Sequence, residues 1–539
     1  MNEFFLCVSS SHSIPSIEQH FGKKPIFQDD CQIFSTSPFP GGFNVSLYEE
    51  TDYTLQHFYE GVKKEKGAYL SRINGDFAFA FWEEGKLYMA KDHFGSRPLF
   101  YYQDEDKFIV ASSMPLIRAA VPLTIDRDYL RQILQRKAVP LQNTFFKEVK
   151  RFPPAHFGYF SLEDRILHLE KYWVLKKVDI SSFSSDDMLL GELQARLEAA
   201  IINRSRTSGK VGCQLSGGLD SSYIAGILAK NIPTERLYTY SFVLNEKTRQ
   251  FSENRVDEKQ TQNALIQKYQ LQNHHPIEDF HFSSAKEEFD RSWNVMGGFS
   301  ETDSIWQDTL YKNASDDNVK IMFSGFPGDE GISDSGYWYF IEEVQGWRWI
   351  NFLFKNPLKN GRKILRYWLK FVSPSQVPKD QIKSYADYLK CKIQRPHTTL
   401  RTESEGLYAA THGIEMRYPL ADIRVLEFLI SLPKHFFEPH AYTRSLFRKL
   451  SKETLPEEIR LQKKNNGALT LAFAEYWINN NFSELKGQKL QDPYQLYSNA
   501  INHPSKSTLT EKKQQVDLYK LDYFINRQRI LDKKADDKI

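Results

Sequence analysis

The residues best suited to chemistry in this chain follow an apolar run that ends at Leu215. They read Ser216-Gly-Gly-Leu-Asp-Ser-Ser222. The glycines let the backbone turn tightly with its amides directed inward, and the helix expected next points its positive dipole end at the same place. Asp220 would repel a phosphate there unless it binds Mg²⁺ that bridges to phosphate oxygens. We therefore predict a polyphosphate-binding loop that carries a metal-binding aspartate.

A second segment repeats this arrangement. Lys320-Ile-Met-Phe-Ser-Gly-Phe-Pro-Gly-Asp-Glu330 is again an apolar strand, a Ser-Gly turn and an acid pair. Neither segment has the G-x-x-x-x-G-K-[ST] pattern of nucleotide hydrolases, which places a lysine where these loops carry an acid. Because Asp220 and Asp329 both lie just beyond a strand end, we predict that they bind Mg²⁺ on the phosphates of a common ligand. Ser324 and Gly325 would then present backbone groups toward the same ligand.

The elements that must position these loops change in character along the chain. Residues 1 to about 170 alternate short apolar runs with turn signals, and Phe77, Phe79 and Phe81 alternate as in a strand with one face inward. The polar stretch 180–187 can cap a helix over 188–205. Beyond it, expected strands at 210–215, 237–243 and 320–323 alternate with helices. The sequence predicts a layered antiparallel β domain followed by a doubly wound parallel sheet with its ligand crevice at the carboxyl ends of the strands.

Further motifs are consistent with this division. The C-terminal half contains Gly413-Ile-Glu-Met-Arg-Tyr-Pro-Leu-Ala-Asp422 and Leu455-Pro-Glu-Glu-Ile-Arg-Leu-Gln-Lys-Lys464. The N-terminal half contains Ile73-Asn-Gly-Asp-Phe-Ala-Phe-Ala-Phe-Trp82 and Ala90-Lys-Asp-His-Phe-Gly-Ser-Arg-Pro-Leu-Phe-Tyr-Tyr102. With the two loops above, they resemble the asparagine synthetase family over nearly the whole chain.

The resemblance implies a two-domain, AMP-forming carbon–nitrogen ligase with ATP and Mg²⁺ as cofactors. Residues 1–175 would form an Ntn-hydrolase-like, glutamine amidotransferase-like domain, and residues 185–539 a PP-loop ATP pyrophosphatase domain with helical additions. The predicted ATP-binding residues are Leu215, Ser216, Gly217, Gly218, Asp220, Ser221, Ser222, Phe242, Ser324 and Gly325. Lys464 aligns with the family lysine that stabilises charge at the phosphate and at the tetrahedral carbon.

The chain departs from glutamine-using members at its start. Those members begin Met-Cys-Gly and use the cysteine as a nucleophile, with its own α-amine as the base. Here the chain begins Met1-Asn-Glu-Phe4, and Cys7 lies within an apolar run, as a small buried side chain would. Asn74, Gly75 and Asp92 match glutamine-binding positions and are interpreted as vestigial. We therefore predict a domain without glutaminase activity.

The proton acceptor for the attacking amine is the least defined part of the predicted site. Relatives that close a β-lactam ring use a Tyr–Glu pair, but the tyrosine position here is Phe326, which cannot transfer protons. Glu403 occupies the glutamate position and is the candidate base. Glu405 competes with it, and a solvated helix charge is an equal alternative for Glu403.

Composition restricts the class of partner. The chain has 539 residues, and 71 basic against 68 acidic side chains give a net charge of +3, so global charge favours neither nucleic acid nor an acidic membrane. The four cysteines are widely spaced, which suits a reducing cytoplasm. We expect no signal peptide and no membrane span, because no uncharged apolar run approaches about 18 residues.

Residues 337–370 are aromatic and then basic and have no clear family counterpart. Core packing is the favoured interpretation, and a groove for a peptide substrate is the alternative. Overall, the sequence favours macrolactam cyclisation of a peptide precursor, as in lasso-peptide cyclases, with possible leader-binding and protease partners. Asparagine synthesis from aspartate and ammonia is the alternative, and a catalytically silent homologue is a third. The substrate and the oligomeric state are not determined by the sequence.

Overall fold

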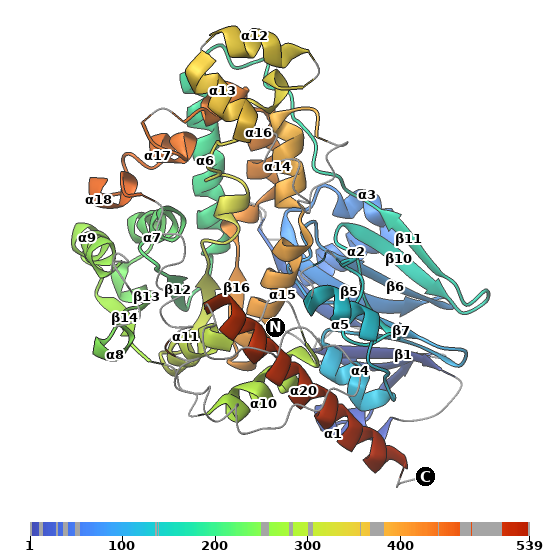
Figure 1. Cartoon of the computed structure of the whole chain (residues 1–539). Coiled ribbons are helices and arrows are strands. Elements are labelled where there is room, and N and C mark those ends of the chain that lie inside the picture. Colours follow the sequence, from blue (N-terminus) through green and yellow to red (C-terminus); the bar gives the residue numbers. More distant parts are fainter. Residues whose placement is uncertain are drawn as a thin grey trace.

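The computed structural model describes most of the chain. The described residues are 3–9, 14–28, 31–35, 41–48, 54–134, 137, 139–249, 258–279, 284–299, 305–345, 347–355, 357–366, 382–439, 441–463, 476 and 509–536. Within them, two antiparallel sheets belong to the N-terminal part and one parallel sheet belongs to the C-terminal part (Figure 1). The predicted fold class, antiparallel layers followed by a parallel sheet, is confirmed.

The N-terminal sheets have the strand orders β2-β3-β1-β8-β7-β9 and β11-β10-β6-β5-β4. The first contains β1 (Phe4–Ser9), β2 (Ile26–Gln28), β3 (Cys31–Ser35), β7 (Phe100–Gln103), β8 (Lys107–Ala111) and β9 (Val149–Arg151). The second contains β4 (Gly42–Leu47), β5 (Gly75–Glu83), β6 (Lys86–Lys91), β10 (His156–Ser161) and β11 (Leu167–Lys171).

Strand β5 has two buried faces, where the sequence predicted one. Ala78, Ala80 and Trp82 pack between the two sheets against alternate residues of β1. The opposite face, which carries the predicted inward residues Phe77, Phe79 and Phe81, packs under α2. Alternation along a strand sends neighbouring side chains to opposite faces. Because helices cover the outer face as well, both sets are buried and the domain has four layers.

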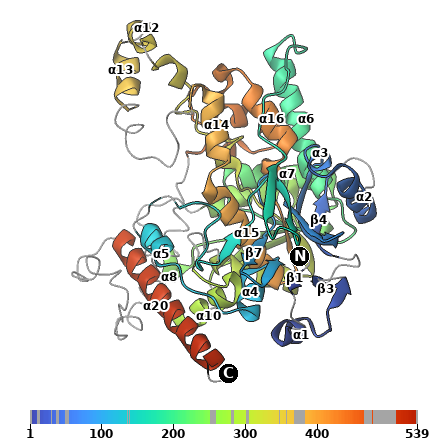
Figure 2. The same ribbon diagram turned by 90° about the vertical axis from the view of Figure 1, so that its right-hand side faces the viewer.

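Helices complete these layers. They are α1 (Pro15–Phe21), α2 (Leu55–Glu65), α3 (Gly67–Leu70), α4 (Met114–Ala120) and α5 (Arg127–Leu134). The C-terminal helix α20 (Leu509–Asp536) also joins this domain, because Leu521, Phe524 and Ile525 pack into the same cluster as Phe5 and Cys7. Figures 1 and 2 show α20 running beside α10. The N-terminal sheets and the parallel sheet lie on opposite sides of the predicted boundary at 175–185 in the sequence. Helix α20 follows that boundary but packs with the N-terminal domain.

The parallel sheet has the order β14-β13-β12-β15-β16. Its strands are β12 (Lys210–Gln214), β13 (Leu237–Phe242), β14 (Asn273–Ile277), β15 (Val319–Phe323) and β16 (Glu415–Arg417). The chain proceeds from β12 to one side and later returns to its other side as β15, so the order reverses between these two strands. In open parallel sheets, ligands bind outside the carboxyl ends of the strands at such a reversal.

Helices lie on both faces of this sheet. One face packs against α6 (Asp186–Arg204), α7 (Leu219–Asn231) and α16 (Ile423–Ser431), and the other against α11 (Ile305–Asp316) and α15 (Pro396–Thr411). The predicted cap of α6 is confirmed, since Ser185 precedes the helix and its hydroxyl accepts a hydrogen bond from the Met188 amide at 3.3 Å.

Shorter helices fill the remaining described segments. They are η1 (Thr234–Arg236), α8 (Glu246–Arg249), α9 (Lys259–Tyr269), α10 (Ala285–Met296), η2 (Gly328–Glu330), η3 (Ile341–Glu343), α12 (Arg348–Lys355), α13 (Pro357–Arg366), α14 (Tyr385–Ile393), η6 (Pro419–Ala421), η7 (Lys434–Phe437), α17 (Ser445–Leu450) and α18 (Glu457–Arg460). Among the described residues, no helix combines the length and apolar character needed to cross a membrane.

Candidate active site

A cavity of about 400 Å³ lies at the carboxyl ends of β12 and β15. Most of the predicted ATP-binding residues contribute to its wall: Leu215, Ser216, Gly218, Asp220, Ser221, Phe242, Ser324 and Gly325. Two do not line it. Gly217 turns away and shapes the loop, and Ser222 is fully buried within α7. The position of the cavity agrees with the strand-order reversal.

The loop before α7 is held by its own serines. The Ser221 hydroxyl accepts a hydrogen bond from the Ser216 amide at 3.2 Å and lies 2.9 Å from the Ser216 hydroxyl. Gly217 has φ +81°, which a side chain would strain, and a Cβ there would come within 2.6 Å of the Thr261 hydroxyl. The turn therefore requires glycine at 217, which supports the interpretation of this segment as a phosphate-binding loop.

The second loop packs directly against the first. A Cβ on Gly328 would meet the Asp220 carboxylate at 2.4 Å from Oδ1. Glycine at this position therefore allows the Asp329 loop to approach Asp220. This approach explains how two segments more than a hundred positions apart in sequence bring their acids to one cavity.

Asp220 and Asp329 both lie beside the guanidinium of Arg444. Arg444 forms an ion pair with Asp329 and lies 3.8 Å from Asp220. One cation placed between the two carboxylates shows that they can share a positive charge. Within the described ranges, no three or more His, Cys, Asp or Glu side chains form a ready-made metal cage. Mg²⁺ in nucleotide sites commonly takes one or two carboxylates together with substrate phosphates, so this donor set fits Mg²⁺ bound with ATP.

Three arginines that were not selected from the sequence also line the cavity: Arg401, Arg444 and Arg448. Arg448 also fastens the chain ahead of the predicted lysine, because it donates to the Gln462 carbonyl at 2.9 Å. The side-chain amide of Gln462 donates to the Gly217 carbonyl at 2.7 Å. The available signal was the spacing of Arg444 and Arg448, which are four apart just before the Leu455 motif.

Lys464 itself lies outside the described residues. Its neighbours Gln462 and Lys463 line the cavity, so the segment that leads to it reaches the site. Its role stays a prediction.

Glu330 also lines the cavity and was not selected from the sequence, although it follows Asp329 directly. Burial raises the pKa of its carboxyl above the ordinary value, and nearby Lys392 only partly offsets this effect. A carboxylate with a raised pKa in a cavity is suited to proton transfer.

Glu403 does not line the cavity, and its contacts do not support the predicted base. Its side chain is 1% exposed, and its two oxygens contact Arg151 at 2.8 Å and Lys91 at 3.5 Å, both from the N-terminal domain. The competitor Glu405 is also buried and accepts from Arg401 at 2.8 Å. Helical spacing explains the error: residues two apart on α15 point to opposite sides.

The residues matched to a glutamine site contact their own protein. Asn74 donates to Asp422 of the C-terminal domain at 2.8 Å, and Gly75 opens β5. The Asp92 carboxylate accepts hydrogen bonds from Ser96 and from the amides of Phe77, Phe94 and Arg97. These contacts support a structural role for this group of residues.

Cys7 is fully buried on β1. Burial raises the pKa of its thiol to about 12, with only a partial opposing effect from Lys107. A thiol with that pKa is almost entirely protonated at neutral pH and is a poor nucleophile. The interpretation of Cys7 as a small buried side chain is confirmed.

The aromatic segment at 337–370 lies away from the cavity in its described part, because no cavity-lining residue belongs to it. Phe340 and Phe352 are buried and stacked at 5.8 Å between ring centroids, with the Lys363 ammonium over both rings. Trp347 and Phe354 are exposed. Part of the segment therefore packs in a small apolar cluster, as the favoured interpretation predicted. Helices α12 and α13 project at one end of the molecule (Figure 1).

Comparisons with known proteins agree with this architecture. The profile of the Asparagine synthase family matches residues 192–529, and that of the Glutamine amidotransferase domain matches residues 55–173. Glutamine-hydrolysing asparagine synthetase 1 of Bacillus subtilis is 23% identical over 82% of this chain and 74% of its own length. Glutamine-hydrolysing asparagine synthetase 2 of the same organism is 23% identical over 91% and 69%.

One solved structure, a glutamine phosphoribosylpyrophosphate amidotransferase from B. subtilis, is 11% identical over 51% of this chain and 80% of its own, with a TM-score of 0.23. So low a score supports no statement about this chain. The family profile covers more than half of the chain, and its match contains the cavity, both acidic loops and α15. The chain belongs to the asparagine synthase family and is an ATP-dependent ligase that forms amide bonds.

Proposed function

We propose that this protein activates a peptide carboxylate as an acyl-adenylate and joins it to an amine of the same peptide, without glutaminase activity of its own. The observation that carries the proposal is the cavity in which the predicted metal ligands Asp220 and Asp329, a glycine loop and three arginines converge. The engagement of Asn74 and Asp92 in protein contacts favours an amine other than ammonia from glutamine.

The first step forms a bond between a carboxylate oxygen and the α-phosphorus of ATP, and the bond to pyrophosphate breaks. Arg444 and Arg448 would hold the departing pyrophosphate, together with the amides at the start of α7. Mg²⁺ bound at Asp220 and Asp329 would neutralise charge on that leaving group.

In the second step the amine nitrogen attacks the acyl carbon, and AMP leaves with the electrons of the acyl–oxygen bond. The amine must lose a proton. We assign its acceptance to the Glu330 carboxylate, because Glu330 lines the cavity beside the acidic loops. The Arg401 guanidinium carbon lies 4.3 Å from the centroid of the Phe326 ring. From this position the guanidinium would attract the substrate carboxylate.

The second candidate function is asparagine synthesis from aspartate and ammonia. It is favoured by the names of the relatives and by the three cavity arginines, which suit a small dianionic substrate. Assays with aspartate and ammonium, and separately with peptides that carry an internal Asp or Glu, distinguish the two. If the protein is a cyclase, we propose that its substrate is a short precursor peptide and that it works with a leader-binding protein and a protease. We propose no nucleic-acid or membrane partner.

We expect ATP to be cleaved to AMP and pyrophosphate, because the two acidic loops are placed to hold a departing pyrophosphate. The measurement is nucleotide chromatography with pyrophosphate detection in the presence of each carboxylate. ADP as the product would contradict adenylation.

We expect free glutamine to yield no glutamate, with or without ATP, since burial keeps the Cys7 thiol protonated. Wild type and Cys7→Ala should behave alike in a glutamate-release assay. Release that disappears only in Cys7→Ala would show that the N-terminal domain is an active glutaminase.

A further inference from the structure

Helix α15 lies between the N-terminal domain and the parallel sheet (Figure 1). One side of this helix faces the N-terminal domain through Thr399 and Glu403, which are four residues apart. The other side carries Arg401 and Glu405, which are also four apart and form an ion pair at 2.8 Å. Residues four apart share a helix face, and residues two apart do not.

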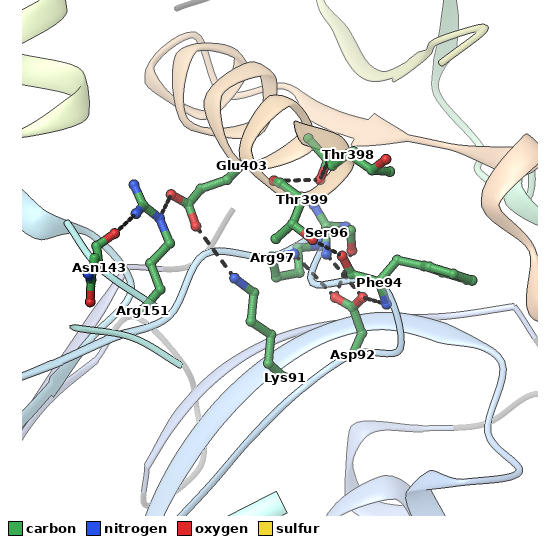
Figure 3. Close-up of polar contacts among 11 residues, drawn as sticks. Lys91, Asp92, Phe94, Ser96, Arg97, Asn143, Arg151, Thr398, Thr399 and Glu403 are labelled. Carbon is green, nitrogen blue, oxygen red and sulfur yellow. Dashed lines mark hydrogen bonds and ion pairs between the residues drawn. The ribbon is translucent and has the colours of Figure 1, made fainter. Parts of the chain in front are cut away.

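The side toward the N-terminal domain is held by charge. Figure 3 shows Glu403 between Arg151 and Lys91, which reach it from β9 and from the end of β6. All three side chains are at least 97% buried. Glu403 is the anion that both cations contact, so its removal would leave two buried positive charges without this partner, and this cost restrains the helix that carries it.

The same side is held by close packing. The Thr399 hydroxyl donates to the Phe94 carbonyl at 2.9 Å (Figure 3). A Cβ on Gly95 would approach the Thr399 methyl at 2.9 Å. Asp92 organises this loop by accepting from the Ser96 hydroxyl and from the amides of Phe94, Ser96 and Arg97. The loop that resembles part of a glutamine site therefore supports α15.

The opposite side of α15 belongs to the cavity. Arg401 lines it and covers the ring of Phe326, and Gln307, another lining residue, donates to Glu405 at 3.3 Å. A small rotation of α15 about its axis would move Arg401 relative to the acidic loops. Displacements of about 1 Å at a reacting centre can reduce a rate by about a hundredfold.

We propose that Glu403 is a positioning residue, through which Lys91 and Arg151 of the N-terminal domain set the rotation of α15 and hence the place of Arg401 in the ligase cavity. The N-terminal domain is then a working part of the synthetase site. The kinetic consequence rests on the proposed function, and the structural consequence does not.

Three variants test the proposal by pyrophosphate release: Glu403→Gln, Arg151→Met and the double variant. We expect each single variant to lower kcat at least about tenfold, with the KM for ATP within about threefold, because the nucleotide loops are untouched. The double variant should be no slower than the slower single variant, since Glu403→Gln already removes the anion that Arg151 contacts. Glu192→Gln, which removes a half-buried ion pair with Arg196 on α6, is the control and should leave kcat unchanged.

Amide hydrogen exchange supplies a readout that needs no turnover. In Glu403→Gln and Arg151→Met, exchange should rise at least about threefold over 396–411 and 91–97 while α7 stays protected. Folded variants with unchanged kcat, additive losses in the double variant, or unchanged exchange over α15 would each overturn the positioning role. A wild type that releases no pyrophosphate with any carboxylate would instead refute the proposed function, and the exchange result would still decide the role of Glu403.

Discussion

Asp220→Asn and Asp329→Asn should each lower the rate of pyrophosphate release at least about a hundredfold while leaving the fold intact. Each change removes one of the two cavity carboxylates that are predicted to bind Mg²⁺. An amide oxygen is neutral and binds Mg²⁺ more weakly at the leaving group, where charge accumulates. The measurement is pyrophosphate release at saturating ATP, with isothermal titration of Mg²⁺–ATP as a second readout.

The fold should survive both changes, because either remaining carboxylate still faces Arg444. Asp316→Asn provides the control, since Asp316 forms an exposed pair with Lys312 and lies outside the cavity. Near-normal turnover in Asp220→Asn or Asp329→Asn, with an unchanged melting temperature, would show that the metal assignment is wrong.

Asp422→Ala should lower the free energy of unfolding by about 3–5 kcal/mol, the largest stability effect that we expect. The Asp422 carboxylate is completely buried and accepts from Arg204 at 2.6 Å and from Asn74 at 2.8 Å. Removal of the carboxylate leaves the Arg204 guanidinium, 2% exposed, with its nearest anion gone. Denaturant titration followed by tryptophan fluorescence measures the loss.

The loss should depend on pH in a defined direction. Burial alone would raise the pKa of Asp422, but Arg204 and Arg424 outweigh it and hold the pKa well below the ordinary value of 3.8. A carboxyl with a depressed folded pKa stabilises the protein fully above its unfolded pKa, and this contribution disappears as the pH falls toward the folded pKa. The difference between wild type and Asp422→Ala should therefore be constant from pH 5 to 7 and shrink below about pH 4.

The matched control is Asp316→Ala, which removes an exposed carboxylate and should change stability by less than about 0.5 kcal/mol. A loss below about 1 kcal/mol in Asp422→Ala, or a difference that grows on acidification, would contradict the assigned ion pair.

The sequence by itself determined features that depend on adjacent residues. The loops at 216–222 and 324–330 could be predicted because a strand, a glycine turn and a helix start are specified by adjacent residues. The same holds for the cap of α6 at Ser185 and for β12, β13 and β15, whose apolar residues follow one another. Strands β14 and β16 were missed, since their short polar segments form strands only by pairing with the sheet.

Only the tertiary structure decided which charges meet. The partners of Glu403 lie 252 and 312 positions away, and no local pattern connects them. Sequence reasoning placed Glu403 at the reaction because it considered one motif, whereas the rotation of α15 directs Glu403 to the N-terminal domain and Arg401 to the cavity. Arg444 was overlooked for the same reason. Direction around a helix and contact between distant segments follow from the packing of the complete chain, because a side chain's surroundings are supplied mainly by residues remote in sequence.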